Sequence, residues 1–151
     1  MKRYLSVLLI LCLVLITGCS NSESKSGSDI GNTEGVDYDL TSLGATALHA
    51  QMETIMIHEP SKYIGKVIRV RGAYDPWRPP EYNEYIQYIM IEGPTDCDKY
   101  LEFRATVERN YPEDYPSIGT IIEIQGVFGI YNIDEHPYPV PYLAIDDFVI
   151  V

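Results

Sequence analysis

The clearest pattern of apolar and polar positions lies in two segments, 64–74 and 118–128, which align with each other without a gap. Apolar residues or glycine occupy every second position, at 68, 70 and 72 in the first segment and at 122, 124 and 126 in the second. This alternation predicts half-buried strands of an antiparallel sheet. Gly72 and Gly126 predict a bulge or sharp coil that lets a small sheet close on itself.

Three further strands are predicted, at 85–91, 100–105 and 142–151. The first follows the proline-rich loop 75–80, and the second follows the loop 93–98. In the last strand, Asp146 and Asp147 interrupt the alternation and predict a bulge. Between the third and fourth strands, the two prolines of segment 110–116 permit at most one turn of helix.

One helix is predicted ahead of the first strand, at about 41–58. Its apolar residues recur at helical spacing; they are Leu48, Met52, Ile55 and Met56. Thr41 or Ser42 could cap its N-terminus, and Pro60 prevents its continuation beyond Glu59. One helix and five strands predict a mostly β domain. Glycines lie in its first and fourth strands, and a crossover follows the third strand. The expected fold is a five-stranded OB-like barrel at about 63–151, within a domain at 36–151.

Two runs of sequence carry a family resemblance. Tyr63–Gly72 resembles the opening strand of small secreted OB-fold lipoproteins of Gram-positive anaerobes, and Tyr111–Thr120 resembles the approach to their fourth strand. The resemblance spans 39–151 and implies the barrel without implying an activity. Many members carry two adjacent cysteines before the third strand, where this chain has Asp96, Cys97 and Asp98.

The first 18 residues are typical of a lipoprotein signal peptide. Lys2 and Arg3 precede an apolar segment of 13 residues, shorter than the roughly 20 residues that a membrane-spanning helix needs. The segment ends in Ile16-Thr17-Gly18-Cys19, which has the pattern of a lipobox. We expect cleavage before Cys19, attachment of lipids (palmitate or related acyl chains) to Cys19 through thioether and amide bonds, and an extracytoplasmic protein anchored to the cell membrane. The alternative is an ordinary secretory peptide cut elsewhere.

Residues 19–35 are rich in serine and glycine and predict a flexible tether, with a glycosylated stalk as the alternative. The chain has 11 basic and 22 acidic residues, and loss of Lys2 and Arg3 would change its net charge from −11 to −13. Such a charge repels nucleic acid and favours cationic partners. With Cys12 removed and Cys19 lipidated, Cys97 would have no cysteine in the chain to pair with.

Aromatic residues around the first hairpin are the leading candidates for ligand binding; they are Tyr74, Trp77, Tyr82, Tyr85 and Tyr88. OB barrels bind ligands across their second and third strands, often by stacking on aromatic rings. The expected ligand is a cell-wall glycan, a peptide or an envelope protein, and not a nucleic acid. Trp77 ranks first because prolines surround it; the alternative for each tyrosine is a place in the barrel core.

Zinc binding is the alternative function, with Cys97, Asp96 and Asp98 joined by His49, His58 or His136. No CxxC or HExxH spacing supports it, and a lone cysteine is more often a small buried apolar residue. Catalysis is disfavoured because the sequence has no nucleophile elbow, phosphate-binding glycine loop or suggestive carboxylate pair. Glu81, Glu84 and Glu102 are expected to be solvated. We expect no cofactor; an accessory subunit of a membrane complex is a third alternative.

Overall fold

The structure is a computed structural model that describes residues 35–134 and 137–151. The expected signal peptide, Cys19, most of the expected tether and His136 lie outside the described residues. The strands are β1 (Tyr38–Asp39), β2 (Val67–Tyr74), β3 (Gln87–Ile91), β4 (Lys99–Ala105), β5 (Ile121–Tyr131) and β6 (Val140–Ile150). The helix α2 (Ala45–Glu53) continues into a π-helical turn, η1 (Thr54–His58), and a 3₁₀ turn, η2 (Pro60–Lys62), follows.

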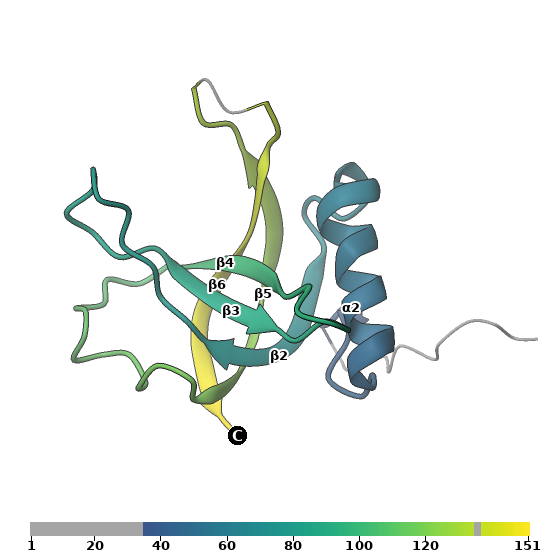
Figure 1. The fold of residues 1–151 in the computed structure, drawn as a ribbon, viewed down its shortest axis with the longest axis horizontal. Coiled ribbons are helices and arrows are strands. Elements are labelled where there is room, and N and C mark those ends of the chain that lie inside the picture. Colours follow the sequence, from purple (N-terminus) through teal and green to yellow (C-terminus); the bar gives the residue numbers. More distant parts are fainter. Residues whose placement is uncertain (1–34, 135–136) are drawn as a thin grey trace, which may run out of the picture.

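The predicted closed barrel of five strands is confirmed. Its strands follow the order β2-β3-β4-β6-β5, and β5 pairs back with β2 to close it (Figure 1). Neighbouring strands are antiparallel except β4 and β6, which are parallel. The short strand β1, which the sequence pattern did not reveal, pairs in parallel with Ile68 and Arg69 of β2, on the edge opposite β5.

The two aligned segments pair with each other in the barrel. Val70 of β2 lies opposite Ile124 of β5, at the centre of the antiparallel ladder. At its ends, the N–H of Gly65 donates to the carbonyl of Phe128 (2.9 Å), and the N–H of Gly119 donates to the carbonyl of Tyr74 (2.8 Å). Because 65 aligns with 119 and 74 with 128, these bonds are equivalent. The repeated sequence therefore corresponds to a local two-fold relation between β2 and β5.

The predicted bulge in β6 is present. Asp146 and Asp147 lie between Ile145, which pairs with Gly126, and Phe148, which pairs with Ile124, so two residues oppose one on β5. The loop after β4 holds both carboxylates. Thr106 donates its hydroxyl to Asp146, and Arg109 donates to Asp147 at 2.6 Å.

The inward side chains of the five strands form one core, which a different element closes at each end. The helical segment contributes Met52 and Ile55, both fully buried. The loop between β4 and β5 contributes Tyr115, whose ring stacks on Tyr74 (5.9 Å between ring centroids) and on Phe148 (6.2 Å). This loop forms turns rather than a helix, as its prolines predicted.

The helix begins later than its apolar spacing predicted. Its N-cap is Gly44, and the expected cap by Thr41 or Ser42 is wrong. The Thr41 hydroxyl instead donates to the carboxylate of Asp39 at 2.6 Å, so it is not available to the helix. Among the residues that the structure describes, no helix is long and apolar enough to span a bilayer.

Candidate functional site

A surface pocket of about 410 Å³ lies beside the first barrel hairpin, between loop 75–86 and the outer faces of β3 and β4. Its lining residues are Asp75, Pro76, Trp77, Tyr88 and Tyr100, and we call it the Trp77 pocket. The backbone of Trp77 exchanges two hydrogen bonds with Ile86, at 2.9 and 2.8 Å, while its side chain remains 55% exposed. The loop thus holds an exposed indole ring on a fixed backbone.

Two tyrosines form the β-sheet side of the pocket. Tyr88 on β3 and Tyr100 on β4 lie edge to face, with ring centroids 6.4 Å apart. Burial, followed by the nearby Glu102 carboxylate, raises the pKa of Tyr88 above its ordinary value. The Tyr88 hydroxyl therefore stays protonated at neutral pH.

The aromatic surface continues from Tyr88 across β4, β6 and β5. In the strand ladders, Glu102 of β4 lies opposite Tyr88 of β3 on one side and opposite Tyr142 of β6 on the other. The guanidinium of Arg104 lies 3.9 Å from the ring centroid of Tyr131 and 4.8 Å from that of Tyr142. The outer face of the barrel therefore carries one row of rings that begins at the Trp77 pocket.

Glu102 lies beneath these rings, and its expected solvation is wrong. Its side chain is only 3% exposed. Arg104 Nε donates to one carboxylate oxygen at 2.5 Å, and the Tyr131 hydroxyl donates to the other at 2.7 Å. Burial and this hydrogen bond to Glu102 raise the pKa of Tyr131 to about 12. Each oxygen of Glu102 thus accepts a hydrogen bond from a side chain of the same outer face.

The five residues expected to bind ligand have different positions. Trp77 and Tyr88 line the pocket. Tyr74 is fully buried, and its hydroxyl donates to Gln87 at 2.5 Å; its expected place on the surface is wrong. Tyr85 stacks on Tyr111, with ring centroids 4.0 Å apart, and so joins two loops. Tyr82 is 56% exposed but is not part of the pocket lining.

Tyr100 is the lining aromatic residue that the sequence analysis missed. It lies opposite Met90 and faces outward, while its neighbour Leu101 is fully buried. The period-two pattern of segment 100–105 could have revealed it, since Leu101 and Phe103 take the inward positions and leave Tyr100 on the outer face.

The residues expected to bind zinc do not converge. Cys97 is exposed, and the Asp98 carboxylate accepts the N–H of Gly93 at 3.1 Å. His49 Nε2 lies 2.6 Å from the carbonyl oxygen of Cys97; a carbonyl only accepts, so this nitrogen carries the proton. His58 lies instead beside Glu53, 3.7 Å away. Within 35–134 and 137–151, no group of three or more His, Cys, Asp or Glu side chains could hold a metal ion.

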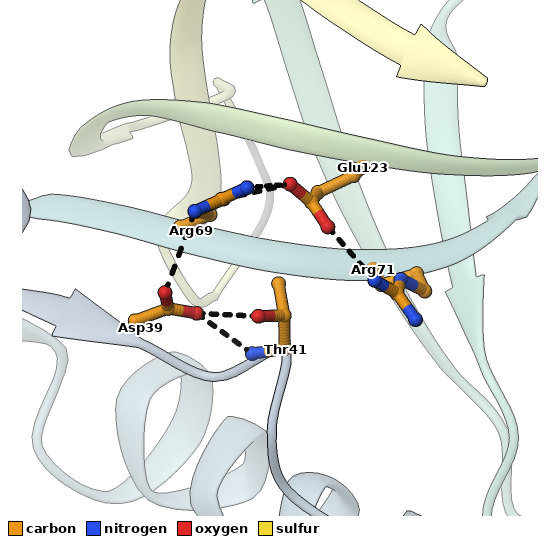
Figure 2. A network of polar contacts seen from close by, with 5 residues as sticks. All are labelled: Asp39, Thr41, Arg69, Arg71 and Glu123. Atoms are coloured by element: carbon orange, nitrogen blue, oxygen red, sulfur yellow. Dashed lines mark hydrogen bonds and ion pairs between the residues drawn. The ribbon is translucent and has the colours of Figure 1, made fainter. Parts of the chain in front are cut away.

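A second polar cluster joins β1, β2 and β5 (Figure 2). Arg69 lies between Asp39, 3.5 Å away, and Glu123, while Arg71 donates to the other Glu123 oxygen at 3.0 Å. Burial alone would raise the pKa of Glu123, but hydrogen bonds from Arg71 and Arg69 outweigh it and lower that pKa. Two carboxylates oppose two guanidinium groups, so the cluster compensates its own charges and acts as a structural clamp.

Replacing Glu123 by glutamine should lower the free energy of unfolding at pH 7 by about 2 kcal/mol, because the hydrogen bonds to a buried charge are lost. The folded pKa lies below its unfolded value, near 4.5, so the native protein has this stabilisation above that pH. The stabilisation is lost as the pH falls through the folded pKa. Urea unfolding at pH 7 and pH 3 measures it, with the exposed Glu113→Gln as control. A difference between native protein and variant that persists unchanged at pH 3 would contradict this assignment.

Comparisons of the chain with protein-family models, curated proteins and solved structures gave no match. The position and chemistry of the Trp77 pocket are therefore the features that bear on function.

Proposed function

We propose that this chain is a lipid-anchored protein of the cell envelope whose OB-like barrel binds a ligand in the Trp77 pocket without catalysis. The strand order of the barrel and the parallel pair β4–β6 support the OB-like assignment. The pocket lies on the second and third barrel strands and on the loop between the first two, the region through which OB barrels bind.

The observation that carries this proposal is the exposed Trp77 ring, held by its backbone above a pocket with two tyrosine walls. Flat aromatic rings with polar tips suit the apolar faces of sugar rings and extended peptides. The volume of the pocket is large enough for one sugar ring or one short stretch of peptide. The row of rings from Tyr88 to Tyr142 offers further contacts to a longer ligand, such as a glycan, a peptide or a segment of an envelope protein.

The proposed location follows from the N-terminal sequence. A charged start, a short apolar segment and the sequence ending in Cys19 are the features that direct a bacterial chain to lipid attachment outside the membrane. The net charge, −11 for the full chain and −13 without Lys2 and Arg3, favours basic or neutral partners in that compartment over nucleic acid.

Replacing Trp77 by alanine should weaken ligand binding at least tenfold and leave the fold unchanged, because an exposed ring contributes contact area but no core packing. The full chain, purified in detergent, is titrated calorimetrically with disaccharide–peptide fragments of cell-wall peptidoglycan. In parallel, the emission of Trp77, the single tryptophan of the chain, reports binding at the pocket.

Tyr82→Ala is the matched control, because Tyr82 is as exposed as Trp77 but does not line the pocket. Its affinity should equal that of the native chain. If the Trp77→Ala protein folds and keeps full affinity, the ligand binds at another surface of the domain.

A further inference from the structure

We propose that the Trp77 pocket binds an organic ammonium group, an inference that rests on the proposed function and specifies its ligand. The pocket is lined by three aromatic residues and one acidic residue, Asp75. Its lining contains no lysine or arginine. Aromatic faces carry partial negative charge and attract cations, and tryptophan does so most strongly.

Asp75 is fixed in place while its carboxylate stays available. Its backbone N–H donates to the carbonyl of Tyr88 at 2.9 Å, which holds the residue beside β3. Within the described residues, its carboxylate has no hydrogen bond or ion pair. An unpaired negative charge beside three rings therefore favours a cation that can desolvate against apolar surface, such as an alkylammonium group.

The same chain already holds a cation between a carboxylate and aromatic rings on the same outer face. Arg104 lies over the rings of Tyr131 and Tyr142, and its Nε donates to the Glu102 carboxylate at 2.5 Å. This cluster contains the same components as the Trp77 pocket, namely a carboxylate and aromatic rings, with the cation supplied by the chain itself. The Trp77 pocket has the carboxylate and the rings, so a ligand would supply the cation.

A second cluster repeats the pattern at the end of the barrel. The guanidinium of Arg109 lies 5.0 Å from the ring centroid of Phe148 and donates to Asp147 at 2.6 Å. Two internal cations thus lie between a carboxylate and an aromatic face. The net charge of −11 adds a long-range attraction that raises the encounter rate with cationic ligands.

The test compares choline with 3,3-dimethylbutan-1-ol, in which carbon replaces the charged nitrogen without changing the shape. Both are titrated into the full chain in detergent while the emission of Trp77 is recorded. We expect choline to bind about tenfold more tightly, since the cation–aromatic and carboxylate contacts act only on the charged probe. The preference should decrease at high salt.

Asp75→Asn should remove most of this preference. Asp134→Asn is its matched control, because it makes the same change of net charge outside the pocket lining and should preserve the preference. Equal affinity of choline and its neutral analogue for the native chain would overturn the inference, as would an equal loss of preference in both variants.

Two further pairs of probes identify the source of the ammonium group. A glucosamine tetramer represents an amino-sugar polymer, and Nα-acetyl-lysine methylamide represents a basic peptide; each is compared with its fully N-acetylated form. A preference for the free amine in either pair supports the inference and names the source. A preference for choline over its neutral analogue without either amine preference supports a quaternary ammonium ligand instead, and absence of all three preferences overturns the inference. Binding of peptidoglycan fragments without any preference for cations would leave the proposed function intact. Failure of every probe and of those fragments to bind would overturn both proposals.

Discussion

Replacing Gly126 by alanine is expected to lower the free energy of unfolding by about 3 kcal/mol. A Cβ atom at this position would lie 2.7 Å from Ile145 Cγ2 and 2.9 Å from the carbonyl carbon of Ala144, and closer still to the carbonyl oxygen of Ala144. Real Cβ atoms do not approach other atoms so closely. Because the obstacle is the backbone of β6, which is paired on both sides here, the strands cannot separate without losing hydrogen bonds.

Gly44→Ala is the matched control. A Cβ atom there would have no neighbour within 4 Å, and the backbone φ of −67° suits alanine. Its effect should stay within about 1 kcal/mol, the small difference between glycine and alanine at a helix N-cap. Urea unfolding of both variants gives the comparison. A Gly126→Ala protein as stable as the Gly44→Ala protein would show that β5 and β6 can accommodate a side chain at this crossing.

The alternation of the sequence predicted the barrel because the core takes every second residue of β2 and β5. The pattern also singled out Gly72 and Gly126, for which it predicts a bulge or sharp coil; the structure shows a close approach of the neighbouring strand at both. Asp146 and Asp147 were identified as a bulge for the same reason, since two adjacent polar residues cannot both fit a period of two. These features depend on neighbours in sequence, so the sequence alone was sufficient to predict them.

For Tyr74, the alternation of apolar positions indicated a buried side chain, but its place beside the Trp77 loop was given more weight. It has the same parity as Ile68 and Val70, which places it inside the barrel, yet its nearness to Trp77 and the loop suggested a surface role. The structure buries it fully.

Glu102 shows a different limit. Its position between the inward Leu101 and Phe103 correctly places it on the outer face, where a carboxylate is normally solvated. It is buried because Arg104 and Tyr131 cover it, and Tyr131 lies 29 positions along the chain. Contacts of this range depend on how β4, β6 and β5 are brought together, which the local pattern does not encode. The unpredicted half of the aromatic face, around Tyr131 and Tyr142, was missed for the same reason.

Replacing Cys19 by serine is expected to remove the protein from the membrane fraction completely. The proposed anchor is attached through the thiol of Cys19, and a serine hydroxyl cannot form that thioether. Each buried CH₂ group of an acyl chain contributes about 0.8 kcal/mol to membrane binding, so loss of the acyl chains leaves almost no affinity for the bilayer. Labelling cells with a palmitate analogue, followed by fractionation, measures attachment and location together.

Cys97→Ser is the matched control, because it changes a cysteine that lies on the exposed loop between β3 and β4, far in sequence from the leader. This variant should keep both the label and the membrane location. Label that remains on Cys19→Ser protein in the membrane fraction would mean that the leader is an ordinary secretory peptide and that another residue anchors the chain. Label lost only from the Cys19→Ser protein would support the lipid anchor at Cys19, and the ligand of the Trp77 pocket would then be sought among groups of the cell envelope.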